Sequence, residues 1–84
     1  MASIMTFSNQ SLVRRLKLQQ LAVFERVLNC GSLLAASREL HMTQPAITKI
    51  IQELEEHFGQ TLLVRSRRGV QPTDFGLMLR NHCR

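Results

Sequence analysis

Residues 33–50 constrain the fold of this chain more than any other stretch, because they predict two short helices separated by a tight turn. The first helix, over about residues 33–40, carries the small pair Ala35-Ala36, which permits a second helix to cross closely. The turn is His41-Met42-Thr43, and Thr43 is a suitable N-cap for the next helix. Pro45 falls in the first turn of that helix, where its missing N–H breaks no hydrogen bond. This order is typical of a helix-turn-helix, which places a helix end in the DNA major groove.

The second of these helices has one apolar face and one polar face. Its apolar residues follow the i, i+3, i+4, i+7, i+11 spacing of a single stripe, namely Ile47, Ile50, Ile51, Leu54 and Phe58. With that stripe buried, a rotation of about 100° per residue turns Pro45, Thr48 and Lys49 outward, and Gln44 lies at the edge of the same face. Gly59 is expected to end the helix.

The outward side chains match the chemistry of base edges. The Gln44 amide can pair with adenine, Lys49 can reach guanine acceptors or a phosphate, and Thr48 offers a hydroxyl and a methyl group to thymine. Pro45 and Ala46 can pack against a thymine methyl. The C-terminal half of the helix is acidic, so we expect it to tilt away from phosphates. The competing interpretation is an ordinary amphipathic helix with a charged solvent face.

A short β-hairpin is predicted after this helix. Residues 62–65 form a β-type run, residues 66–69 a turn, and residues 70–71 a returning strand that Pro72 stops. Two strands in this position make a wing. Arg65, Arg67 and Arg68 place dense positive charge on it, and one arginine could enter a narrow minor groove while the others hold phosphates. A solvated loop is the alternative.

The remaining segments predict an arm and two more helices. Residues 1–15 are expected to form a loose N-terminal arm, residues 16–72 the domain, and residues 73–84 the start of a further helix, cut inside its pattern. A core stripe is predicted for the first helix, at Leu18, Leu21, Phe24, Val27 and Leu28. A second stripe, predicted to serve dimerisation, is Phe75, Met78 and Leu79. The basic cluster at residues 14–17 is either a solvated helix start or a phosphate contact.

Composition agrees with one small basic domain that is mainly α. The chain has 84 residues, with 11 Lys and Arg against 6 Asp and Glu, which favours a polyanionic partner. Four Phe and no Tyr or Trp weaken the case for single-strand or RNA binding by base stacking. No apolar run approaches a membrane span, and no signal peptide is visible, so we expect a cytoplasmic protein.

No catalytic or metal-binding pattern is present in the sequence. Cys30 and Cys83 lack the spacing of a zinc site and are expected to be reduced thiols. His41, His57 and His82 fall on different predicted elements, and there is no glycine-rich phosphate loop. We therefore expect no cofactor in this chain and no enzymatic activity.

Several short motifs, taken in order, resemble the N-terminal domain of LysR-type bacterial transcriptional regulators. The similarity covers residues 16–80. The motifs are Gly31-Ser32, Ala35-Ala36, Leu40-His41, Thr43-Gln44-Pro45-Ala46-Ile47-Thr48, Leu54-Glu55, Phe58-Gly59, Leu62-Leu63 and Arg65-Ser66-Arg67-Arg68-Gly69.

This resemblance implies a winged helix-turn-helix followed by a linker helix that pairs with its twin in a dimer. It also implies a C-terminal domain, absent here, that binds a small inducer and sets the full-length oligomer, typically a tetramer. Carried over by position, the major-groove contacts are Gln44, Pro45, Thr48 and Lys49. By the same correspondence, Thr43 anchors the helix end to a phosphate, Arg68 enters the minor groove, and Arg65 supports the wing.

The chain departs from the usual pattern of that family at four places. Leu33-Leu34 replaces the usual Phe-Thr, Lys49 stands where Arg is common, Pro72 replaces an apolar residue, and the N-terminal arm is longer. The function we expect is sequence-specific binding of double-stranded promoter DNA as a dimer. The alternatives are a winged-helix protein-interaction module and the DNA-docking part of a larger enzyme such as a recombinase.

Overall fold

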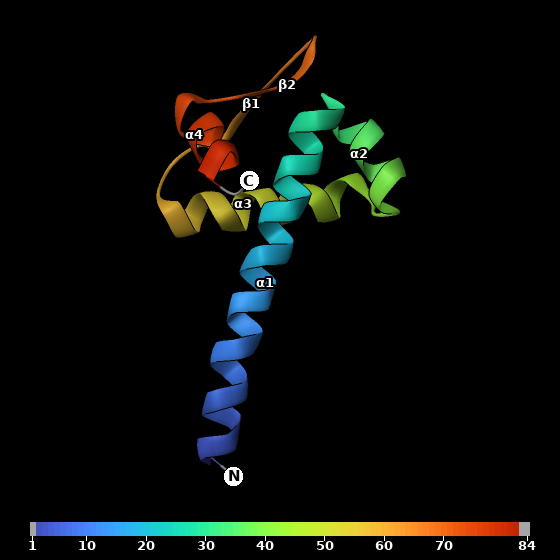
Figure 1. Ribbon diagram of the computed structural model, residues 1–84. Helices are drawn as coiled ribbons and strands as arrows, with labels where there is room; N and C mark the ends of the chain where they lie inside the picture. The colour runs from blue at the N-terminus through green and yellow to red at the C-terminus, as the bar shows by residue number, and fades with distance from the viewer. Residues whose placement is uncertain (1, 83–84) are drawn as a thin grey trace.

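The computed structural model describes the backbone of residues 2–82 and the side chains of residues 11–82. The long first helix crosses α3, and its N-terminal half projects beyond the rest of the molecule (Figure 1). The elements are, in order, α1 (Ala2–Cys30), α2 (Leu33–Leu40), α3 (Gln44–Phe58), β1 (Leu63–Ser66), β2 (Gly69–Pro72) and α4 (Asp74–His82). This is the predicted winged helix-turn-helix, mainly α with one hairpin.

Helix α1 is longer than the sequence analysis predicts. Residues 2–15, where we expect a loose arm with some helix near its end, continue α1 without a break, and residue 1 lies outside the described residues. The Ser, Thr and Asn side chains of this segment lower helix propensity by only about 0.5 kcal/mol each. No Gly or Pro interrupts residues 2–30. A domain boundary near residue 15 stays a prediction.

Side-chain caps define the ends of the two helices that form the helix-turn-helix. The Ser32 hydroxyl accepts the Ala35 backbone N–H at 3.1 Å, and the Thr43 hydroxyl accepts that of Ala46 at 3.3 Å. His41 ends α2 in the left-handed conformation, with φ 55°, and Gly59 ends α3. The caps predicted at Thr43 and Gly59 are therefore confirmed, and Ser32 caps α2 in the same way.

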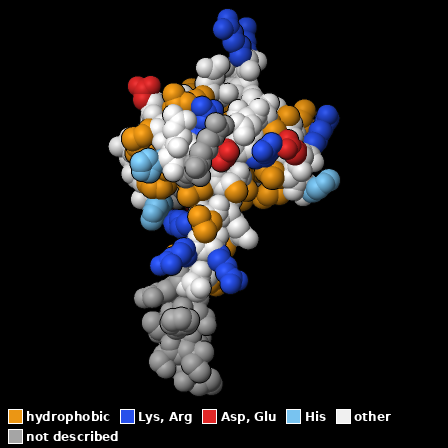
Figure 2. Space-filling model, in the orientation of Figure 1, with side chains coloured by type: hydrophobic (Ala, Val, Ile, Leu, Met, Phe, Trp, Pro, Cys, Tyr) orange, Lys and Arg blue, Asp and Glu red, His pale blue; other side chains and the backbone are white. Residues whose placement is uncertain are grey.

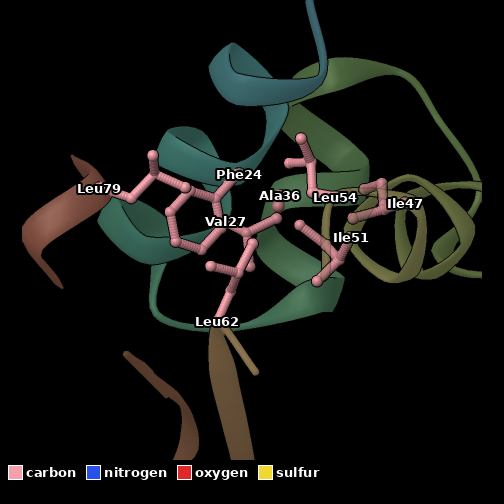
Figure 3. Packing of buried hydrophobic residues seen from close by; sticks show 8 residues of the cluster. All are labelled: Phe24, Val27, Ala36, Ile47, Ile51, Leu54, Leu62 and Leu79. Carbon is pink, nitrogen blue, oxygen red and sulfur yellow. The ribbon is translucent and has the colours of Figure 1, made fainter. Parts of the chain in front are cut away.

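A single core joins all four helices and the start of the wing (Figure 3). Its buried members are Phe24, Val27, Ala36, Ile47, Ile51, Leu54, Leu62 and Leu79. Leu21 and Leu28 pack at its margin, as do the aromatic rings of Phe58 and Phe75. Leu18, predicted as a core residue, is 62% exposed, so that prediction is wrong. It precedes the point where α1 meets α3, and helical spacing alone does not reveal where contact begins.

The wing is an antiparallel hairpin held against the end of α1. Leu63 pairs with Pro72 and Ser66 with Gly69, so residues 67–68 form the tip. The Val70 backbone N–H donates to the Gly31 carbonyl at 3.0 Å, which anchors the returning strand beside the helix-turn-helix. The hairpin therefore has a defined position relative to α2 and α3.

Helix α4 packs mainly onto the chain's own core. The Thr73 hydroxyl caps it by accepting the Gly76 backbone N–H at 3.0 Å. Leu79 is 9% exposed and Phe75 is half-buried against Phe58, with ring centroids 5.7 Å apart. Both residues therefore contribute to the chain's own core, and their role in a dimer contact stays a prediction. Met78 of the same stripe is 54% exposed.

Candidate nucleic-acid interface

The first turn of α3 presents its polar side chains to solvent. Gln44, Pro45 and Lys49 are exposed, and Ala46 and Thr48 are half-buried beside them. They face outward because the opposite side of α3 supplies three fully buried residues to the core. Pro45 has no N–H and the Ala46 N–H donates to Thr43, so the Gln44 N–H and the positive dipole end of the helix remain to favour an anionic or electronegative ligand.

This turn forms one wall of an open hollow between α2, α3 and the wing. Gln44, Pro45, Thr48 and Lys49 line it from α3, and Arg65 lines it from β1. The structure thus brings together residues that the sequence predicts on two separate elements.

Three further residues line the same hollow and were not among the predicted contacts: Leu33, Ser37 and Gln52. Gln52 lies one turn beyond Thr48, and its outward direction follows from the helical rotation. Leu33 and Ser37 belong to α2. Their place beside α3 depends on how the two helices cross, which no pattern within either helix predicts.

Arg65 joins the wing to the recognition face of α3. Its Nη2 donates to the Thr48 Oγ1 at 2.8 Å, across 17 positions of sequence. Both side chains remain accessible at the hollow. Arg65 therefore lies in β1, paired with Val70 one step below the last residue pair of the hairpin, and its side chain turns toward α3.

Arg67 and Arg68 occupy the hairpin tip, and both are exposed. Figure 2 shows basic side chains projecting at the free end of the hairpin, well clear of the core. The Arg68 backbone N–H donates to the Ser66 hydroxyl at 3.2 Å, which holds the turn. Among the described side chains of the wing arginines, that of Arg65 is the one that hydrogen-bonds to α3.

Charge along α3 is asymmetric. Lys49 lies in its N-terminal half, whereas Glu53, Glu55 and Glu56 lie in its C-terminal half. Glu55 accepts the Leu62 backbone N–H at 2.8 Å and so fixes the start of the wing. A polyanion is therefore attracted to the N-terminal end of α3 and repelled from the other end.

A second basic cluster, Arg14, Arg15 and Lys17, belongs to α1. In Figure 2, basic side chains lie where this helix leaves the body of the molecule, far from the hairpin tip. Arg14 and Arg15 are exposed. This position favours the solvated-helix interpretation of the cluster over a phosphate contact.

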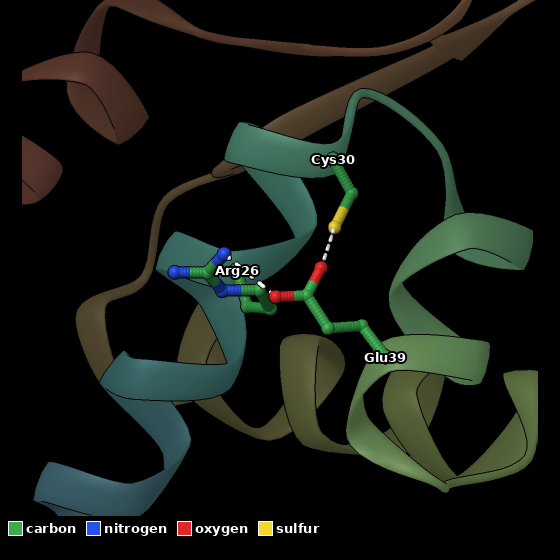
Figure 4. Close-up of polar contacts among 3 residues, drawn as sticks. All are labelled: Arg26, Cys30 and Glu39. Atoms are coloured by element: carbon green, nitrogen blue, oxygen red, sulfur yellow. Dashed lines mark hydrogen bonds and ion pairs between the residues drawn. The ribbon is translucent and has the colours of Figure 1, made fainter.

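A three-residue cluster ties α2 to the end of α1 (Figure 4). The Glu39 carboxylate accepts from the Arg26 guanidinium at 2.9 Å and from the Cys30 thiol at 3.1 Å. The hydrogen bond to Glu39, then burial, then the negative charge of Glu39 raise the pKa of the Cys30 thiol, and the Arg26 charge opposes them. Cys30 is thus held as a neutral thiol. Cys83 lies outside the described residues.

The described residues contain no group of three or more His, Cys, Asp and Glu side chains placed to hold a metal ion. Among the helices that the structure describes, none is both long and apolar enough to cross a membrane.

The family model for the bacterial regulatory helix-turn-helix protein, lysR family, matches residues 18–77. The chain belongs to the LysR family. The match covers the helix-turn-helix, the wing and the first half of α4, which confirms the resemblance noted in the sequence.

Named relatives of this LysR-family chain are regulators. The HTH-type transcriptional regulator TdcA of Escherichia coli K12 is 46% identical over 63 residues, covering 75% of this chain and 20% of TdcA. The nitrogen assimilation regulatory protein nac of Klebsiella aerogenes is 39% identical over 69 residues, covering 82% of this chain and 23% of the relative. The chain thus spans about a fifth of the length of the curated relatives it matches.

Solved structures of the family share the fold. The LysR-family regulator CbnR superposes with a TM-score of 0.76 at 38% identity, covering 79% of this chain and 23% of CbnR. The DNA-binding domain (DBD) of CbnR in a complex with DNA superposes with a TM-score of 0.74 at 38% identity, covering 79% of this chain and 76% of that chain. The DBD of BenM in a complex with benA site 1 DNA superposes with a TM-score of 0.74 at 33% identity, covering 79% of this chain and 77% of that chain.

Proposed function

We propose that this LysR-family chain binds double-stranded promoter DNA in a sequence-specific manner and so regulates transcription. The observation that carries the proposal is the open first turn of α3, which presents Gln44, Thr48 and Lys49 beside a basic wing. A major groove accepts a helix end of this kind. The DNA complexes formed by the DBDs of CbnR and BenM, which have the same fold, support it. The role is binding, without catalysis.

Each predicted contact has a part in this proposal. Gln44, Pro45, Ala46 and Thr48 contact base edges in the major groove, and Lys49 contacts a guanine or a phosphate. Lys49 supplies a point charge where an arginine would supply a two-pronged contact, so we expect weaker discrimination at that base.

The two ends of the interface contact the DNA backbone and the minor groove. Thr43 lies at the N-terminus of α3, where a phosphate is favoured by the helix dipole. At the hairpin tip, Arg68 enters the minor groove, where narrow A·T-rich segments concentrate negative potential, and Arg67 contacts a flanking phosphate. Arg65 supports both parts from β1, where it hydrogen-bonds to Thr48.

We further propose that the chain acts as a homodimer on an interrupted palindrome. Met78 is the exposed member of the predicted stripe and is free to contact a partner. Leu77, on the same helix, is 40% exposed and adds apolar surface beside it. For the full-length protein we propose a tetramer, a C-terminal domain that binds a small-molecule inducer, and a cytoplasmic location. The size of the relatives supports a further domain.

The proposal is tested by selecting bound duplexes from a random pool and then titrating the selected duplex against a random one at several salt concentrations. We expect a preferred sequence and an affinity that falls steeply with salt, since phosphate contacts release counterions. Equal binding to both duplexes would contradict sequence-specific regulation. A chain that binds neither duplex at low salt would favour the protein-interaction alternative.

A further inference from the structure

The contact between Arg65 and Thr48 determines which way the Thr48 hydroxyl can hydrogen-bond. The Arg65 guanidinium has N–H donors and no acceptor, and it stays charged at any pH a protein tolerates. Its Nη2 lies 2.8 Å from the Thr48 Oγ1, so the oxygen must accept in this bond. One of the two lone pairs of the hydroxyl is thereby occupied, and its single hydrogen remains to be donated.

The neighbouring hydroxyl in the same hollow behaves differently. Ser37 donates its hydrogen to the Leu34 carbonyl at 2.8 Å, within its own helix. Thr48 makes no such bond to a carbonyl of α3 among the side chains of residues 11–82, although threonine in a helix often does. Its hydroxyl hydrogen is therefore available to a ligand in the hollow that Thr48 lines.

We propose that Arg65 is a positioning residue that makes Thr48 a hydrogen-bond donor toward DNA. This inference rests on the proposed function and specifies its base preference. Because Arg65 takes one lone pair of the Thr48 oxygen, we expect a base acceptor such as thymine O4 or guanine O6 to be preferred there, and the amino groups of cytosine N4 and adenine N6 to be disfavoured, since one lone pair is left to accept from them. Without Arg65, both lone pairs are free to accept from an amino group, so the preference at that one base pair relaxes.

The same contact limits what Arg65 itself does. Because its guanidinium is directed toward α3, it is not available to the minor groove beyond the hairpin tip, where Arg67 and Arg68 lie. Its charge still attracts nearby phosphates. Arg65 therefore affects affinity on all sequences through charge, and base choice at one position through Thr48.

The test compares base preferences of folded variants. The wild-type chain and the variants Thr48→Val, Thr48→Ser, Arg65→Met, Arg65→Lys and Arg67→Met are each used to select duplexes from a random pool. Affinities are then titrated on duplexes that differ only at the preferred base pair. Circular dichroism melting establishes that each variant is folded. Arg67→Met is the matched control, because it removes the same charge from the same hairpin without touching Thr48.

We expect Thr48→Val to lose about tenfold discrimination at one base pair, in line with the loss of one specific hydrogen bond, and Thr48→Ser to retain it. Arg65→Met should reduce discrimination at that same base pair and at no other. Combined with Thr48→Val, it should cause no further loss of discrimination there. Arg65→Lys should retain the preference, because the lysine ammonium, like the guanidinium, has N–H donors and no acceptor. Replacing thymine by uracil keeps O4 and removes the methyl group, so the effect of Thr48→Val should persist on the uracil duplex.

Two results would overturn the inference while leaving the proposed function intact. One is an Arg65→Met variant that weakens binding equally on all duplexes, as Arg67→Met is expected to do. The other is a Thr48→Val variant with unchanged base preference or a uniform loss, which would mean that the hydroxyl donates to a phosphate. A wild-type chain with no preferred sequence would overturn the proposed function together with this inference. Failure of the proposed function is therefore distinguishable from failure of the inference alone. If Arg65→Met does not fold, the Arg65→Lys, Thr48→Val and Thr48→Ser variants still decide the result.

Discussion

Gly76 occupies a position where the fold leaves no room for a side chain. A Cβ added there would lie 2.0 Å from the Leu62 carbonyl oxygen, and that oxygen is backbone. The same carbonyl accepts the Thr73 N–H at 3.0 Å, so moving it would disturb the junction between the wing and α4. Helix α4 can pack against the start of β1 only because this position lacks a side chain.

We predict that Gly76→Ala destabilises the chain by about 1–3 kcal/mol, the usual cost of overpacking, despite the better helix propensity of alanine. The free energy of unfolding is measured by urea denaturation followed by circular dichroism. The control is Asn81→Ala, an exposed position on the same helix, where a change within about 0.5 kcal/mol is expected. Equal stability of Gly76→Ala and wild type would mean that α4 does not pack as described.

Glu39 controls the ionisation of Cys30. Because the folded-state pKa of the Cys30 thiol is raised, its contribution to stability is complete below the ordinary thiol pKa and is lost as pH rises through the raised value. We predict that Glu39→Ala lowers the pKa of Cys30 and that Arg26→Ala raises it further, since Arg26 favours the thiolate. Both substitutions break the same ion pair, so opposite shifts separate electrostatics from structural damage.

The pKa is measured from the ultraviolet absorbance of the thiolate as a function of pH, in a Cys83→Ser background. Shifts of the same sign in both variants would show that loss of the contact between α1 and α2 dominates. In that case the electrostatic account of Cys30 would be wrong.

At the scale of elements, α2, α3 and the hairpin are predictable from sequence because their signals are local. Thr43 and Pro45 mark the start of α3, Gly59 marks its end, and the polar strip containing Thr48 follows from the burial of the opposite face. Each of these depends on residues within a few positions of one another.

The length of α1 and the role of α4 are not predictable in the same way. Leu18 and Leu79 have equal apolar character, but Leu18 is exposed and Leu79 is buried. The difference lies in which helix crosses nearby, and this is a tertiary property. The contact from Arg65 to Thr48 also spans two elements, so the sequence predicts both residues without predicting that they meet.

The N-terminal cap of α3 links its stability to its proposed binding role. We predict that Thr43→Ala costs about 1 kcal/mol of folding free energy, because the Ala46 N–H loses its acceptor. Thr43→Ser should restore both stability and affinity, since it keeps the hydroxyl. Urea denaturation and a DNA titration on the same samples check this. A destabilised Thr43→Ala that binds with wild-type affinity would remove Thr43 from the DNA contact.

At the scale of the whole molecule, positive charge and the open turn of α3 lie together, while acidic residues occupy the other half of that helix. The net charge of +5 favours association with a polyanion in general. Direct readout of base edges must come from the few side chains in the hollow, because phosphate contacts carry no base information.

The most direct test of this account is the affinity of Gln44→Ala for the selected duplex and for a random duplex, measured side by side. Gln44 is exposed on the open turn and carries no net charge, so its loss should leave phosphate contacts unchanged. We predict a loss of about 1–3 kcal/mol on the selected duplex, relaxed choice at one base pair, and little change on random DNA. Equal losses on both duplexes would contradict the placement of α3 in the major groove.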